Sequence, residues 1–209
     1  MRDAERVRPV EACFLATLAE AGFAVSSVAG IRRQFDPLPN ALAALLLEWI
    51  PRLEDQRLQE SVVWALLAAP KATLDGAALA ELFAAATNDD LKRAIAAVIN
   101  QSRPQDIDEW LIAAVRDRRS GAARHLLAAA VAKMLPPDRA VAVLIDLFHD
   151  DPLAAVHPLG KVGDSGVRDF LTARLSTARG PLRRELRQAI ARIDRRLANP
   201  RRNRNGVKS

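Results

Sequence analysis

The three histidines, His125, His149 and His157, have the clearest potential for chemistry, because an imidazole can bind a transition metal or transfer a proton. Near His149 the sequence places Asp146 and Asp150, which could add oxygen ligands. A metal site needs several such ligands to converge, and a turn at the protein surface accounts for these residues more simply. We therefore interpret the histidines as surface residues, and predict that the protein holds no metal and no cofactor.

Nucleophilic chemistry has little support in the sequence. Serine and threonine residues occur without a recognisable nucleophile elbow, oxyanion loop or paired base. The single cysteine, Cys13, stands between Ala12 and Phe14 in an apolar segment, and no second cysteine exists for an internal disulfide. We interpret Cys13 as a small core residue and predict that the protein is not an enzyme.

Three glycines, Gly160, Gly163 and Gly166, resemble a loop that could cradle a phosphate with its backbone amides. Phosphate-binding fingerprints need a strand before the loop and a helix after it. Here the preceding segment has a helical pattern, and glycine is common where a helix ends. The glycines therefore indicate the end of a helix.

The elements that carry these residues recur with a period. The last large apolar residue of the first helix in each predicted hairpin recurs about every 32 residues, at Leu18, Ile50, Phe83, Val115, Phe148 and Leu175, where the final interval is shorter. Such periods are typical of arrays in which each hairpin buries its apolar face against its neighbours. We predict six hairpins in one domain over residues 1–198, at about 9–34, 39–69, 75–101, 105–134, 137–162 and 164–198.

The composition favours an all-α fold. Half of the residues are hydrophobic, tyrosine is absent, and the chain is rich in Ala and Leu, which are strong helix formers. The longest apolar runs, 41–47 and 126–132, are far shorter than the roughly 20 residues that cross a bilayer. The segment from Met1 to Arg6 lacks the apolar core of a secretory signal. We predict a cytoplasmic protein without a membrane span.

The segment from Asp150 to Asp164 resembles the HEAT-repeat family, in particular the short bacterial HEAT-like repeats of phycobilin lyases. In it an acidic turn leads to a helix that ends in Leu-Gly-Lys-Val-Gly-Asp at 159–164. The resemblance covers about residues 10–198 and implies a right-handed α-solenoid of six hairpins. Pro158 departs from the family pattern, so we expect its helix to be kinked or shortened near Ala154.

The resemblance implies a non-catalytic, monomeric scaffold that binds a protein partner along its concave face. Three alternatives stay open: a nucleic-acid-binding protein that acts through a basic carboxyl terminus, an immunity or antitoxin-like protein, and a bilin-lyase-like factor that loads a cofactor. HEAT enzymes of the deoxyhypusine hydroxylase type carry repeated His-Glu pairs, and none occurs here. HEAT-like glycosylases present an aromatic ring with a carboxylate. The candidate here is Trp110, which follows Asp106, Asp108 and Glu109. Acidic residues are common at a helix start, so we interpret Trp110 as a packing residue. We assign Trp49 and Trp64 to packing as well.

Two sets of basic residues are the candidate binding groups. The first set begins the predicted second helices and would form a stripe on the concave face: Arg57, Lys92, Arg93, Arg124, Arg183 and Arg187. The second set lies near the carboxyl terminus, in a segment (179–209) with 11 basic and only two acidic residues. Its members are Arg195, Arg196, Arg201, Arg202 and Arg204. We predict that residues 199–209 form a disordered basic tail, which either binds a polyanion or keeps the terminal repeat soluble.

Overall fold

The computed structural model describes residues 2–199, with side chains from residue 10 onward, and all of the regular structure in this range is helical. The all-α class is therefore confirmed. The α-helices are α1 (Arg2–Glu20), α2 (Val28–Gln34), α3 (Asn40–Trp49), α4 (Gln56–Ala65), α5 (Gly76–Ala85), α6 (Asp89–Ser102), α7 (Asp108–Arg116), α8 (Arg124–Met134), α9 (Pro137–Asp150), α10 (Pro152–Val162), α11 (Ser165–Leu175) and α12 (Gly180–Ala198). Short 3-10 helices are η1 (Ile50–Arg52), η2 (Leu66–Ala68) and η3 (Arg118–Ala123). Within residues 2–199, no helix combines the length and the apolar character that a bilayer crossing requires.

Side-chain caps fix where many of these helices begin. A carboxylate or amide oxygen accepts the backbone N–H three residues further on and satisfies a donor that the first helical turn leaves open. Asp55, Asp75, Asn88, Asp151 and Asp164 all act in this way, over distances of 2.7–3.1 Å. Each cap follows a break in the apolar pattern, so the chain folds back at these points.

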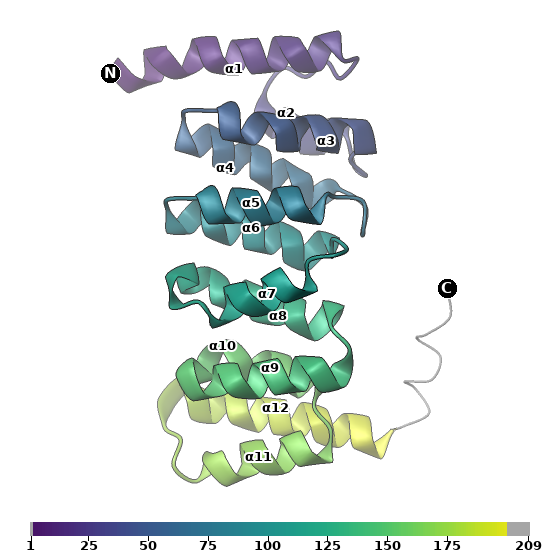
Figure 1. Cartoon of the computed structure of the whole chain (residues 1–209), viewed down its shortest axis with the longest axis vertical. Helices are drawn as coiled ribbons and strands as arrows, with labels where there is room; N and C mark the ends of the chain where they lie inside the picture. The colour runs from purple at the N-terminus through teal and green to yellow at the C-terminus, as the bar shows by residue number, and fades with distance from the viewer. Residues whose placement is uncertain (1, 200–209) are drawn as a thin grey trace.

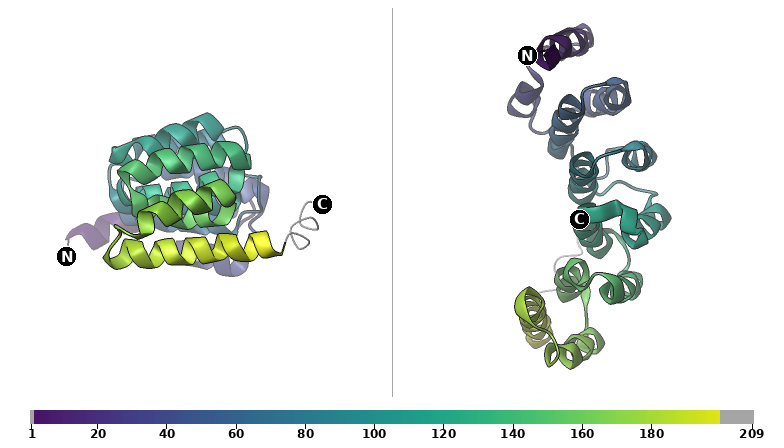
Figure 2. Two further views of the ribbon diagram at one scale, coloured as in Figure 1. Left: turned by 90° about the horizontal axis from the view of Figure 1, so that it is seen from below. Right: turned by 90° about the vertical axis from the view of Figure 1, so that its left-hand side faces the viewer.

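The helices lie in two layers that follow the chain along the long axis of the molecule (Figure 1). The even-numbered helices α2 to α12 pack directly on one another, each against the next, and form the inner layer of a shallow bow (Figure 2). The odd-numbered helices form the outer layer and are less closely packed among themselves. The inner layer thus exposes one continuous, curved face.

Aromatic pairs bridge outer helices of neighbouring hairpins. Phe14 of α1 meets Trp49 of α3, Phe83 of α5 meets Trp110 of α7, and Phe148 of α9 meets Phe170 of α11, with ring centroids 5.3–5.5 Å apart. Such tilted or edge-to-face contacts add to the stabilisation from burial. Trp49 and Trp110 are therefore contacts between hairpins, as predicted. Trp64 is half-buried and donates its indole N–H to Glu60 at 3.1 Å.

Three local expectations are wrong. Cys13 is exposed, because α1 turns Phe14 and Leu18 toward its neighbours and Cys13 away from them. In the fourth hairpin, the sequence pattern predicts a second helix over 120–134. The helix begins at Arg124 instead, because the Asp117 carboxylate accepts the Arg119 N–H and Gly121, at φ +52°, is not helical. Pro158 does not shorten α10, which continues to Val162 with Pro158 buried inside it.

The structure also explains Gly160, which lies where α10 meets α12. A Cβ built on Gly160 would lie 2.9 Å from both the Cα and the Cβ of Ala189, closer than real side chains approach. Gly160 therefore permits close helix packing. Gly166, in α11, has open space around it except for Asp164 Oδ1 at 3.4 Å.

We expect Gly160→Ala to lower the free energy of unfolding by about 1–3 kcal/mol, because the added methyl group overpacks the α10–α12 contact. Gly166→Ala is the matched control and should be neutral or stabilising by about 0.5–1 kcal/mol, since alanine favours the helix. Urea unfolding followed by circular dichroism measures both. Equal effects of the two substitutions would contradict the proposed packing role of Gly160.

Candidate interaction surface

The six residues of the predicted stripe do not form one accessible row. Arg57, Arg183 and Arg187 are exposed, and Arg93 is exposed but pairs with Asp90 at 3.2 Å. Lys92 Nζ donates to the Arg119 carbonyl at 3.0 Å and lies 6.0 Å from the centre of the Phe83 ring. The stripe is therefore interrupted in its middle.

Arg124 is the clearest departure, because its side chain is only 8% exposed. Its guanidinium donates to the Val115 carbonyl at 3.0 Å and to Asp150 Oδ2 at 2.5 Å. Arg118 also donates to Asp150. The hydrogen bond from Arg118, and to a smaller extent the one from Arg124, holds the pKa of the Asp150 carboxyl below its usual range. Arg124 thus joins the fourth hairpin to the fifth and is not available to a partner.

The histidines lie apart from one another. His125 Nε2 is 3.9 Å from Asp151, His149 packs edge-on against the Phe170 ring, and His157 contacts Arg192 through Nδ1 at 3.3 Å. Burial, together with Arg192 and Lys161, lowers the pKa of His157. Among the residues that the structure describes, no three His, Cys, Asp or Glu side chains converge as a metal site would require.

A different set of cations marks one edge of the inner layer. We call it the basic edge, and it consists of Lys71, Arg103, Lys133, Lys161, Arg192 and Arg195. Lys71 lies in the loop that follows α4 and η2, and Arg192 lies one turn before the last turn of α12. The others lie in or just after the last turns of inner helices. All of these helix ends face the side where the chain passes to the next hairpin, at the right of Figure 1. Consecutive hairpins, from the second to the sixth, each supply at least one of them.

Backbone contacts hold neighbouring hairpins together at this edge. The Ala72 N–H donates to the Ser102 carbonyl at 2.6 Å, so the loop that carries Lys71 lies against the end of α6, where Arg103 follows. Lys133 Nζ donates to the Asn100 carbonyl at 3.1 Å. Burial lowers the pKa of Lys133, and the charges of Lys161, Arg103 and Lys71 lower it further. Lys133 therefore lies among three other cations of this edge.

Arg196 has a structural role at the same edge. Its guanidinium donates to the carbonyls of Gly160, Lys161 and Gly163, which the end of α10 leaves open. Burial and the charge of Arg192 lower its pKa. Of the two described residues of the predicted polyanion tail, Arg195 is exposed and Arg196 is engaged with the backbone. Arg201, Arg202 and Arg204 lie outside the described residues.

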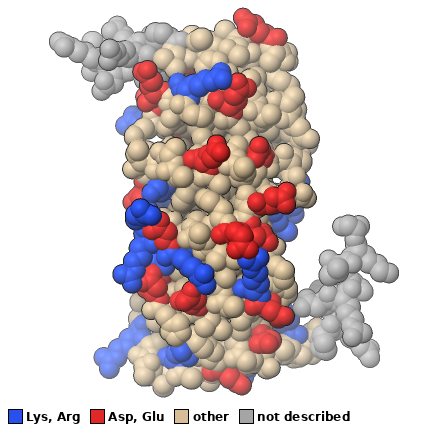
Figure 3. Space-filling model, viewed as in Figure 1, with Lys and Arg blue, Asp and Glu red and all other residues tan. Residues whose placement is uncertain are grey.

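The basic edge differs from the outer face in its lack of counter-ions. The outer layer mixes both signs (Figure 3), and its pairs Arg116–Asp146 and Arg139–Glu109 join α7 to α9. Within residues 10–199, no member of the basic edge forms an ion pair with a carboxylate. The cations of the basic edge thus have no carboxylate partner among the described residues, whereas Arg116 and Arg139 on the outer face do.

The middle of the inner face carries mostly small side chains. Ser61 of α4, Ala97 of α6, Ala129 of α8 and His157 of α10 lie on the solvent side of their helices, opposite the buried residues that contact the outer layer. These four residues form the floor beside the basic edge, and they make no constellation that would indicate catalysis.

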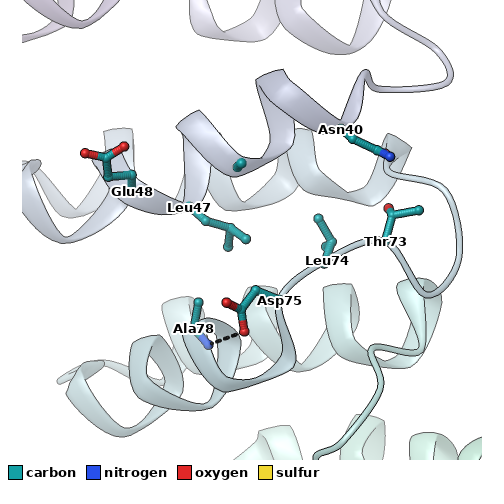
Figure 4. A pocket seen from close by; sticks show the side chains of 8 residues that line it. Asn40, Leu47, Glu48, Thr73, Leu74, Asp75 and Ala78 are labelled. Atoms are coloured by element: carbon teal, nitrogen blue, oxygen red, sulfur yellow. Dashed lines mark hydrogen bonds between the residues drawn. The ribbon is translucent and has the colours of Figure 1, made fainter.

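Grooves on the outer side are shallow. One of about 310 Å³ lies between α3 and α5, lined by Leu47, Leu74, Glu48 and Asp75, and Figure 4 shows that the Asp75 carboxylate is used to cap α5 through the Ala78 N–H. It occurs where no aromatic pair bridges the outer helices. A second, of about 360 Å³, is lined by Phe83 and Trp110 with the Lys92–Arg119 contact. Ser120 also lines the second groove, and its hydroxyl donates to the Ala114 carbonyl at 2.7 Å.

The basic edge was missed by sequence reasoning, which considered the first residues of the second helices instead of the last ones. A signal was present, because Lys71, Arg103, Lys133, Lys161 and Arg192 recur at nearly the hairpin period.

Comparison of the chain with protein-family models, curated proteins and solved structures finds no match.

Proposed function

We propose that this protein is a non-catalytic, HEAT-like right-handed α-solenoid of six hairpins that binds a macromolecular partner on its concave inner face. The hairpin period in the sequence and the two layers of stacked helices support this classification. Stacked hairpins expose long curved surfaces, and a long surface suits a large partner better than a small ligand.

The observation that carries the proposal is the asymmetry of the two faces. The outer face has balanced charges and shallow grooves, whereas the inner layer presents a floor of small side chains beside cations without counter-ions. Leaving charges of one sign unpaired creates a potential that attracts an oppositely charged surface. The proposed partner is therefore acidic where it touches the basic edge.

Site-specific photo-crosslinking in cells tests this proposal. A benzophenone amino acid replaces Ala97 or Ala129 on the inner face, and Ala84 or Ala142, which are exposed on α5 and α9, as outer-face controls. We expect a defined high-mass product, protein or nucleic acid, from the inner positions and none from the outer ones. Products of equal yield at all four positions, or no product at the inner positions, would overturn the proposal.

A further inference from the structure

We propose that the basic edge binds the phosphate backbone of double-stranded nucleic acid without reading its sequence. This inference rests on the proposed function, because it names the partner of the inner layer. It depends on three features of the molecule: the unpaired cations, the absence of aromatic anchors among them, and the length of the row.

The first feature is the concentration of like charge. Lys71, Arg103, Lys133 and Lys161 come from four successive hairpins. The loop of Lys71 and the Lys133 ammonium both donate to carbonyls at the end of α6, directly before Arg103. Bringing cations together costs free energy that a bound polyanion would recover. A phosphate backbone also releases its own condensed counter-ions on binding, which favours association with a row of cations.

The second feature distinguishes nucleic acid from an acidic protein surface. A protein interface normally has an apolar centre with aromatic anchors. Among the described residues, the large hydrophobic side chains that are exposed are Leu153, at 43%, and Leu197, at 47%, on α10 and α12. Leu197 lies in the last turn of α12, at one end of the row, and the basic edge contains no aromatic residue. Its contacts are therefore mainly electrostatic.

The same composition favours a duplex over a single strand. Proteins that bind single strands stack the bases on aromatic rings. The aromatic side chain on the inner side of α4, Trp64, is half-buried and donates its N–H to Glu60. Contacts to phosphates position a duplex without specifying its sequence.

The third feature is the length of the row. Packed helices lie about 8–10 Å apart, so five successive inner helices place the ends of the basic edge roughly 40 Å from each other. A duplex rises about 3.4 Å per base pair, and the row would therefore cover about 12 base pairs. A stiff duplex presents phosphates continuously over that distance.

Fluorescence anisotropy with the full chain tests the proposal, using a labelled 24-base-pair DNA duplex and an RNA duplex of equal length. The edge variant combines Lys71→Gln, Arg103→Gly and Lys161→Gln. Glycine suits position 103 because Arg103 is left-handed, at φ +50°, so this substitution removes a charge without straining the fold. The matched outer-face variant combines Arg52→Gln, Arg116→Gln and Arg139→Gln and lowers the net charge by the same amount.

We expect the edge variant to weaken binding at least tenfold at low salt, and to reduce the slope of log affinity against log salt by about 3. The outer-face variant should weaken binding less than threefold. An 8-base-pair duplex should bind more weakly per site than the 24-base-pair duplex. Binding of both RNA and DNA duplexes is expected for contacts to phosphate alone.

Four results would overturn the proposal: no duplex binding by the unmodified protein, equal losses in the two variants, tighter binding of a single strand, or equal competition by polyglutamate. Polyglutamate competition that is lost in the edge variant would assign the edge to an acidic polypeptide instead. None of these results affects the photo-crosslinking test, so failure of the duplex proposal can be told apart from failure of the proposed function.

Discussion

Replacing Ile95 with Asp is expected to unfold the protein at 25 °C. Ile95 lies in α6 between α4 and α8 and is 0% exposed. The substitution removes about 2 kcal/mol of apolar burial and leaves a carboxylate without a partner, which costs several kcal/mol more. Since domains of this size are stable by about 5–15 kcal/mol, most of the folding free energy would be lost. Far-ultraviolet circular dichroism should show a large loss of helix signal.

Two variants control for this result. Gln101→Asp places the same carboxylate on the exposed side of the same helix and should change the unfolding free energy by less than about 0.5 kcal/mol. Ile95→Val keeps an apolar side chain and should cost about 1 kcal/mol. Helicity and a melting temperature that Ile95→Asp leaves unchanged would show that the described core position is wrong.

The sequence predicted the helices well where local chemistry decides their limits. Asp75 and Asn88 precede apolar runs and cap the helices that follow, and Pro152 and Pro181 occupy first turns, where the missing N–H has no cost. Pro51 likewise lies where α3 tightens into η1. These features depend on residues within one turn of each other, and a pattern can identify them.

The sequence failed where distant residues decide the outcome. A basic residue at the start of a second helix normally faces solvent, yet Arg124 is buried because Asp150 lies 26 positions further along the chain and receives its guanidinium. Cys13 lies in an apolar segment, which predicts a core position, yet the packing of Phe14 and Leu18 turns it outward. The lack of counter-ions at the basic edge likewise depends on where every carboxylate lies in space.

Arg124→Ala should lower the free energy of unfolding by about 1.5–3 kcal/mol, because it removes the charged hydrogen bonds that the buried Arg124 side chain donates to Asp150 and to the Val115 carbonyl. Arg118→Ala is the matched control, because Arg118 donates to the same carboxylate from a side chain that is 83% exposed. Exposed pairs contribute about 0–1 kcal/mol, so this variant should remain close to the unmodified protein. Urea unfolding at neutral pH and fixed salt compares the two. Similar losses in both would contradict the burial of Arg124.

Acid unfolding tests the same cluster from the side of Asp150. Hydrogen bonds from Arg118 and Arg124 lower the pKa of this carboxyl in the folded protein, whereas in the unfolded chain it is about 3.9. The folded state therefore binds fewer protons than the unfolded state below about pH 5. The stabilisation from Asp150 is fully present above that range and is lost as the pH falls through the lowered folded-state pKa. Asp150→Asn should make stability fall less steeply with acid, although Asp117, whose pKa is lowered by Arg119, keeps its own contribution. An acid profile as steep in Asp150→Asn as in the unmodified protein would show that Asp150 has an ordinary pKa, and that the junction of the fourth and fifth hairpins does not depend on its charge.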